Sequence, residues 1–216
     1  MHARLYAAAA AAAALCTACP TNDCFIGDPN AAPTIGVVYR SGDGTMHDLA
    51  AGGQVPLLLP PQGGKVIFVG VRAKNIDGCP VTISASIRDQ CTQSLIAHEE
   101  RPVTLESTGD GWLTPKIPDA LENYSNLPAC PRAALDRDVN NEPYQLEIKI
   151  EDKKGRTATT AITVVPVCNT PDQQAQCECE CAADYRQGAS CTGEHPDSGV
   201  PAGTCRSDGG SVGGDQ

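Results

Sequence analysis

Cysteine is the residue type with the clearest chemistry in this chain, which has twelve cysteines among 216 residues. That number is far too high for a reducing cytosol, where thiols are kept free. We therefore expect an oxidising compartment and a disulfide framework. Ten cysteines are predicted to form the bridges: Cys24, Cys79, Cys91, Cys130, Cys168, Cys177, Cys179, Cys181, Cys191 and Cys205.

The C-terminal run CECEC could do a second kind of chemistry. Its cysteines, Cys177, Cys179 and Cys181, could bind a metal ion as thiolates. An oxidising compartment instead favours a small disulfide knot, which we predict for residues 168–205. The stretch CECECAADYRQGASC resembles the second half of an EGF-like module in its CxC, tyrosine, glycine and closing cysteine. Such a segment has almost no core and depends on its bridges.

Acidic residues in the stretch DRDVNNEPYQLE suggest a cation site. Calcium could be bound by side-chain oxygens with the spacing of a calcium loop, from Asp136, Asp138, Asn140 and Glu147. Asn141 stands where glycine is usual, and asparagine tolerates the left-handed conformation. The alternative is a solvated acidic loop. We predict no cofactor, with calcium in this loop as the alternative.

Histidines and catalytic motifs give little support for an enzyme. The stretch AHEERP begins like HExxH but lacks the second histidine, which excludes a zinc protease of that type, and we expect His98 to be solvated. Neither a GxSxG motif nor a P-loop occurs. Trp112 is expected to be at least partly buried. We therefore predict no catalytic residues and no enzymatic activity. The formal net charge of −10 also argues against nucleic-acid binding, which needs a basic face.

The N-terminus predicts a targeting segment. Arg4 supplies a positive charge, and Leu5–Leu15 form an apolar run of suitable length. The CTAC that follows resembles a bacterial lipobox, the site read by the lipoprotein signal peptidase, with Cys16 where that family usually has leucine. The resemblance implies cleavage after Ala18 and lipidation of Cys19. It also leaves ten cysteines, an even number for disulfides.

These residues need a scaffold, and the chain from residue 33 to residue 167 predicts one made of strands. Apolar and polar residues alternate with period two, and Gly, Pro, Asn and Asp mark the turns. The predicted strands are residues 34–40, 65–75, 80–89, 94–100, 102–108, 144–152 and 156–167. They predict an all-β fold, an antiparallel immunoglobulin-like sandwich. The closing stretch YQLEIKIEDKKGRTAT resembles the last two strands of immunoglobulin-like domains of bacterial surface proteins.

The direction of the strands predicts two of the disulfides. Consecutive antiparallel strands reverse direction, so loops after alternate strands share one end of the sandwich. Cys79 and Cys91 flank one strand of roughly twelve steps of 3.3 Å and are too far apart to pair. Cys24 and Cys79 are expected at one end, and Cys91 and Cys130 at the other. Each of these two pairs is predicted to form a bridge.

The connection from Pro115 to Pro143 is a candidate binding loop. It is longer than ordinary sandwich loops, and long loops in compact domains are usually functional or disordered. We expect it at the end opposite Cys24, where loops on a rigid scaffold could bind a partner. Its most polar candidates are Asp136, Asp138 and Asn140.

The expected organisation is a signal peptide (1–18), a tether (19–33), the sandwich (34–167), the disulfide knot (168–205) and a flexible tail (206–216). We predict a lipid-anchored protein of the cell envelope that faces the periplasm or the exterior. It resembles uncharacterised lipoproteins of Gram-negative bacteria. The expected role is binding or scaffolding, with the membrane engaged through the lipid and an envelope protein or glycan as partner. A calcium-stabilised adhesion module is the alternative, and an envelope enzyme the less expected one.

Overall fold

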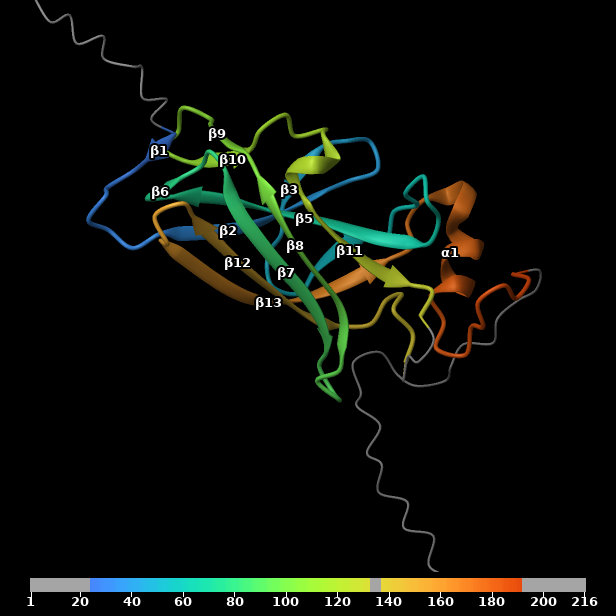
Figure 1. Ribbon diagram of the computed structural model, residues 1–216. Helices are drawn as coiled ribbons and strands as arrows, with labels where there is room; N and C mark the ends of the chain where they lie inside the picture. The colour runs from blue at the N-terminus through green and yellow to red at the C-terminus, as the bar shows by residue number, and fades with distance from the viewer. Residues whose placement is uncertain (1–23, 133–136, 192–216) are drawn as a thin grey trace, which may run out of the picture.

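The computed structural model describes residues 24–132 and 137–191 (Figure 1). The predicted signal peptide, the lipidation site Cys19, the loop residue Asp136 and Cys205 lie outside these residues. Within them, no helix is long and apolar enough to cross a membrane.

Strands are the main regular structure of the described residues, and each of the seven predicted strands corresponds to a strand in the structure. The strands are β1 (Phe25–Ile26), β2 (Thr34–Arg40), β3 (Met46–Asp48), β4 (Gly53–Pro56), β5 (Lys65–Lys74), β6 (Ile76–Asp77), β7 (Val81–Asp89), β8 (Leu95–Val103), β9 (Leu105–Ser107), β10 (Leu113–Pro115), β11 (Ser125–Cys130), β12 (Tyr144–Asp152) and β13 (Thr157–Val167). The helical elements are two 3-10 turns, η1 (Leu121–Asn123) and η2 (Pro171–Gln173), and the helix α1 (Gln174–Glu180).

The long strands form two sheets. One has the order β3-β2-β5-β10-β9, with β11 also paired to β5, and the other has the order β4-β13-β12-β7-β8. The pairings are antiparallel except for β4 and β13, which run parallel. A short β1–β6 pair stands apart from both sheets. The predicted fold class, an all-β antiparallel immunoglobulin-like sandwich with a small C-terminal disulfide-rich knot, is confirmed.

The core between the sheets follows from the period-two alternation. In β12 the side chains of Leu146, Ile148 and Ile150 are fully buried, whereas Glu147 and Lys149 point to solvent. Aliphatic residues of both sheets belong to one buried cluster. A smaller cluster around Phe68 and Tyr124 lies on the outer face of the first sheet. Burial of this apolar surface is the main driving force for the fold.

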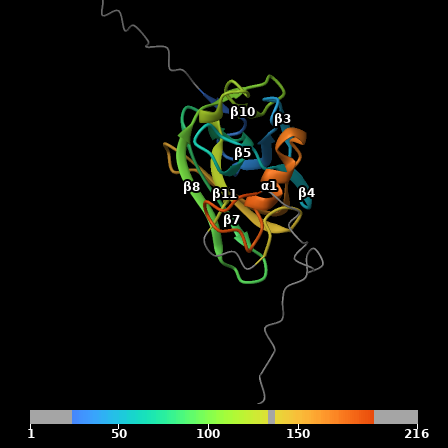
Figure 2. The ribbon, with the colours of Figure 1, turned by 90° about the vertical axis from the view of Figure 1, so that its right-hand side faces the viewer.

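The sandwich has two ends of different construction. At one end, called the Cys24 end, Cys24 and Cys79 form the predicted disulfide, and β1 pairs with β6. The opposite end, called the α1 end, holds Cys130, Asp89 and α1 (Figure 1). Figure 2 faces this second end and shows α1 between β11 and β4. Cys177 of α1 and Cys181, directly after α1, belong to the main core, so the knot is packed onto the sandwich.

The predicted Cys91–Cys130 bridge is wrong. Cys130 is bonded to Cys181 in the knot. Cys91 is also disulfide-bonded. The eight other cysteines in the described part of the chain pair among themselves, so the partner of Cys91 lies outside those residues. The prediction places Cys130 and the start of the knot at Cys168 at the same end, as found, but it does not foresee that a cysteine of the knot pairs with Cys130.

The connection from residue 115 to residue 143 is not one long loop. It contains η1 and the strand β11, which pairs with β5 from Ser125 to Cys130. Its first part covers the outer face of the first sheet, where Tyr124 is buried against Gly70. Cys130 at the end of β11 reaches the α1 end, where it is bonded to Cys181, and so do the described residues from Arg137 onward.

Candidate functional site at the disulfide-rich end

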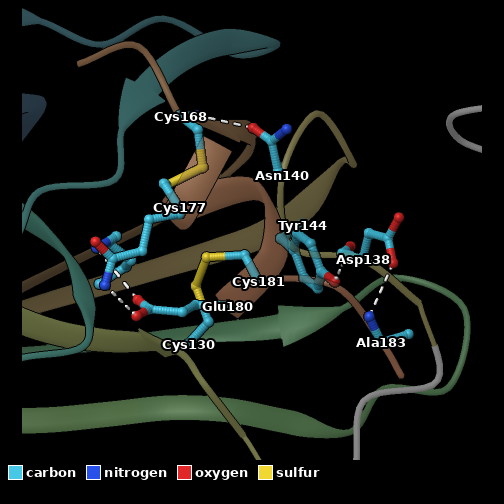
Figure 3. Close-up of a disulfide and its surroundings, with 11 residues drawn as sticks. Cys130, Asp138, Asn140, Tyr144, Cys168, Cys177, Glu180, Cys181 and Ala183 are labelled. Carbon is cyan, nitrogen blue, oxygen red and sulfur yellow. Dashed lines mark hydrogen bonds and ion pairs between the residues drawn. A yellow bond between two sulfur atoms is a disulfide. The ribbon is translucent and has the colours of Figure 1, made fainter. Parts of the chain in front are cut away.

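The helix α1 brings the cysteines of the knot onto the core. Cys177 and Cys181 are one helical turn apart and therefore lie on the same face of α1. Cys177 is bonded to Cys168, which follows β13, and Cys181 is bonded to Cys130 at the end of β11 (Figure 3). A third bridge joins Cys179 to Cys191. Two of the three bridges thus fasten α1 to strand ends.

The two bridges at the face of α1 are close to one another. The sulfur atoms of Cys168, Cys177 and Cys181 all lie within 4.8 Å of one another, and all three side chains are buried. In the described part of the chain, this is the one group of three or more His, Cys, Asp or Glu side chains close enough to share a metal ion. The sequence predicted the bridges of this run, but it gave no indication that separate bridges would be neighbours.

Two residues of the predicted calcium loop hold the knot in place. Asp138 accepts a hydrogen bond at its Oδ1 from the backbone N–H of Ala183, at 2.8 Å. Asn140 accepts one at its Oδ1 from the backbone N–H of Cys168, also at 2.8 Å (Figure 3). The hydroxyl of the buried Tyr144 donates to the carbonyl oxygen of Asp138 at 2.8 Å. These side chains act as caps for the backbone of the knot.

The described residues do not assemble the predicted calcium site. The Oδ1 atoms of Asp138 and Asn140 accept hydrogen bonds from backbone N–H groups. The same two residues were also predicted to bind a partner from the loop before Pro143. Glu147 lies in the middle of β12, opposite Ser86 and Ala161 on the exposed face of the sheet. Asp136 lies outside the described residues. Asp138 and Asn140 thus support the knot, Glu147 lies in a strand outside the loop, and calcium binding stays a prediction.

A buried ion cluster supports the same end. Arg137 pairs with Asp89 at 2.6 Å and with Glu142 at 3.3 Å, and its guanidinium lies 4.8 Å from the ring centre of Tyr144. Burial alone would raise the pKa of Asp89, but hydrogen bonds from the N–H of Thr92, from Arg137 and from the N–H of Cys91 hold that pKa below its usual value. Burial raises the pKa of the Tyr144 hydroxyl, which stays protonated and can donate.

A second buried ion pair runs beside the Cys130–Cys181 bridge. Lys65 is opposite Cys130 in the β5–β11 ladder, and Glu180 precedes Cys181 in the chain. The Lys65 Nζ lies 3.2 Å from Glu180 Oε2, and the side chains are only 1% and 15% exposed. Neither atom has a well-directed hydrogen-bond partner within the described residues. The pair therefore ties β5 to α1 by charge.

The outer face of the second sheet carries another polar group of side chains. Ser84 Oγ lies 3.1 Å from His98 Nε2, across the β7–β8 pairing. A shallow cavity of about 170 Å³ adjoins them and is lined by Thr82, Ser84, Glu100, Lys149 and Glu151. Sequence reasoning treated His98 as a solvated residue and missed this neighbour, because the two residues meet only through strand pairing. On an open sheet face the pair has no enclosing walls to exclude water.

Trp112 is half-buried on the outer face of the first sheet, in agreement with expectation. Its ring lies beside two cations, with the Lys74 Nζ at 4.7 Å and the Arg72 guanidinium carbon at 5.4 Å from the centroid. Arg72 also pairs with Asp110 at 2.9 Å. Cation–π contacts of this kind fix the ring in place.

Comparisons with known proteins add little to this picture. No family model matches the chain, and no curated protein matches it. Among solved structures, that of CopC from Methylosinus trichosporium OB3b is similar over 56% of this chain and 88% of that chain, with 14% sequence identity and a TM-score of 0.28. A TM-score this low supports no argument about fold or function. The disulfides themselves are typical of an oxidising compartment outside the cytoplasm.

Proposed function

We propose that this chain is a lipid-anchored protein of the cell envelope with a binding or scaffolding role and no catalytic one. The observation that supports this most is the Cys24–Cys79 disulfide, which fastens the chain to the sandwich directly after the expected lipidation site. The lipobox-like CTAC before it supplies the anchor at Cys19. The disulfide framework agrees with an oxidising compartment.

The short distance between the anchor and the bridge gives the domain an orientation. Four residues separate Cys19 from Cys24, and a chain this short reaches about 17 Å at most at roughly 3.4 Å per residue. The Cys24 end is then held close to the headgroups, and the α1 end points away from the membrane. A partner protein or glycan would meet the α1 end first.

The α1 end is also the more rigid of the candidate surfaces. Three disulfides, the Arg137 cluster and the Lys65–Glu180 pair hold its elements together. Rigid surfaces lose little conformational entropy when a partner binds. In this proposal Asp138 and Asn140 do not contact the partner but hold the knot in place, through the hydrogen bonds that they accept from its backbone.

The anchor is tested by replacing Cys19 with serine. Wild-type protein, produced in a Gram-negative host and labelled with a radioactive fatty acid, should carry the label and enter the detergent phase on Triton partitioning. Cys19→Ser should lose the label and move to the aqueous phase, because a serine hydroxyl cannot form the thioether. Cys16→Ser is the matched control, since Cys16 leaves with the signal peptide, and should behave as wild type. A Cys19→Ser protein that keeps the label would refute the proposal.

A further inference from the structure

We propose that, when reduced, the cysteines Cys130, Cys168, Cys177 and Cys181 form a binding site for one thiophilic divalent ion of the zinc type. This inference goes beyond the proposed envelope role and does not depend on lipidation. It starts from the closeness of two separate disulfides rather than from the CECEC run, of which only two cysteines take part.

The sulfur positions are close to those of a tetrahedral site. Zn–S bonds of about 2.3 Å place four sulfurs about 3.8 Å apart. The sulfurs of Cys168, Cys177 and Cys181 already lie within 4.8 Å of one another, and that of Cys130 is bonded to Cys181. Small side-chain rotations can therefore convert two neighbouring bridges into four ligands. Structural zinc sites with four cysteines have this ligand set.

The backbone around the sulfurs is held by contacts other than the bridges. The N–H of Val139 donates to the carbonyl of Cys181 at 2.8 Å. Asn140 binds the N–H of Cys168, and Asp138 binds the N–H of Ala183, each at 2.8 Å. These hydrogen bonds do not involve the sulfur atoms, and we expect them to persist when the disulfides open. The ligands therefore keep their relative places, which limits the entropy lost on metal binding.

Burial also suits a structural metal site. The four cysteines are between 0% and 7% exposed, so water is largely excluded. Lys65 is opposite Cys130 in the β5–β11 ladder, and its ammonium group is paired with Glu180 at 3.2 Å, so the pair adds no net charge beside the sulfurs. Cys24, Cys79, Cys179 and Cys191 neither belong to the group of three sulfurs nor are bonded to one of its members, whereas Cys130 is bonded to Cys181.

The chemistry balances with a dithiol as reductant. Each of the two disulfides accepts two electrons and two protons from a dithiol, which becomes a disulfide, and four thiols result. The metal ion then replaces the thiol protons, which pass to water. The same thiols are present in the newly made chain before oxidation. Metal binding and bridge formation therefore compete for the same four sulfurs.

Cobalt titration of the reduced protein tests the site. The full chain is reduced with a phosphine, kept free of oxygen and titrated with Co²⁺. We expect the intense visible and charge-transfer absorption of tetrahedral cobalt thiolate, saturating at one ion per chain and abolished by added Zn²⁺. The double variant Cys168→Ser, Cys177→Ser should lose this spectrum. The matched control Cys179→Ser, Cys191→Ser removes another knot bridge and should keep it, and oxidised protein should show no such spectrum.

Three results would overturn the proposal. They are the absence of a tetrahedral thiolate spectrum in reduced wild type, equal spectra for the two double variants, and saturation only at two or more ions per chain. Circular dichroism of the same samples covers the case in which reduction unfolds the chain. A reduced chain that loses its β-sheet signal and does not regain it with one equivalent of Zn²⁺ also contradicts a preformed site.

Discussion

Single side-chain carboxylates at the α1 end connect elements that are far apart in the sequence. Asp89 shows how one side chain serves several elements. One of its oxygens accepts hydrogen bonds from the N–H groups of Cys91 and Thr92, at 2.6 and 2.9 Å, and the other accepts one from Arg137 at 2.6 Å. The turn after β7 and the chain before β12 thus share one carboxylate. An asparagine would keep the turn contacts but would present an N–H to a guanidinium.

Asp89→Asn should therefore destabilise the protein at neutral pH, by about 1–3 kcal/mol for a charged hydrogen bond lost in a buried place. The native pKa of Asp89 lies below its usual value. Its contribution is thus fully present above the unfolded pKa of about 4 and is lost as the pH falls through the native pKa. Urea unfolding of wild type and Asp89→Asn at pH 7 and pH 3 measures the contribution of ionised Asp89 to the free energy of unfolding.

The difference between variant and wild type should shrink at pH 3. Asp110→Asn is the control, because the ion pair of Asp110 with Arg72 is exposed and screened by solvent, and its unfolding midpoint should change little. A difference for Asp89→Asn that stays the same or grows in acid would show that its ionisation does not support the fold.

At the scale of elements, period-two alternation predicted the long strands well, because one buried face imposes the pattern directly. Strands β3, β4 and β10 have only three or four residues, too few to show a period. β11 was missed for another reason, since Pro128 interrupts it and proline argues against a strand with two neighbours. β11 pairs only with β5, so one of its edges has no neighbouring strand. A strand of this kind tolerates a proline, which lacks the N–H group.

The knot was predicted as disulfides but not as a helix. Alternate cysteines in CECEC suggest an extended chain, yet residues 174–180 form α1 and bring Cys177 and Cys181 to one face. The pairing then depends on distances that the sequence does not contain. The end assignment correctly placed Cys24 with Cys79. It failed for Cys130, because several cysteines meet at the α1 end and only the packing of α1 selects among them.

The packing of α1 onto β5 can be tested through the Lys65–Glu180 pair. Lys65→Met leaves a carboxylate that is only 15% exposed without its cation, and the expected cost is about 3–5 kcal/mol. The double variant Lys65→Met, Glu180→Leu should recover most of this, because neither buried charge remains. Denaturant unfolding of Lys65→Met, Glu180→Leu and the double variant gives the coupling free energy between the two side chains.

The surface pair Lys149–Glu151, with both side chains nearly half exposed, is the matched control. Lys149→Met should hardly change the unfolding midpoint, since solvent screens such pairs. If Lys65→Met were equally mild, or the double variant no better than the single one, the ion pair would not fasten α1.

At the scale of the whole molecule, the cysteine count makes a prediction about the chain beyond the described residues. Cys91 is disulfide-bonded, and its partner must be Cys16, Cys19 or Cys205. If Cys16 leaves with the signal and Cys19 carries lipid, Cys205 remains. Peptide mapping of the mature protein without reduction should therefore find a Cys91–Cys205 peptide. A peptide joining Cys91 to Cys19 would contradict both this bridge and the lipid anchor.

The orientation of the anchored domain can be measured because the chain has a single tryptophan. Trp112 follows the turn between β9 and β10, beside Lys74, and this hairpin contacts the Cys24 end, where Leu105 donates its N–H to the carbonyl of Gly78 at 2.9 Å. Tyr185 lies just beyond α1 at the other end. The ten residues of β5 separate the two ends by roughly 33 Å.

Energy transfer from tryptophan to a dansyl group on lipid headgroups should then be strong for wild-type lipoprotein in vesicles. It should be weak for a variant that combines Trp112→Phe with Tyr185→Trp, because transfer falls with the sixth power of distance. The phenylalanine keeps a ring for Lys74, and both sites are half-buried, so neither change should disturb the core. Non-lipidated Cys19→Ser protein gives the background. Equal transfer from the two tryptophan positions would mean that the sandwich lies flat or tumbles, because a domain held upright by the Cys24–Cys79 bridge keeps its α1 end away from the headgroups.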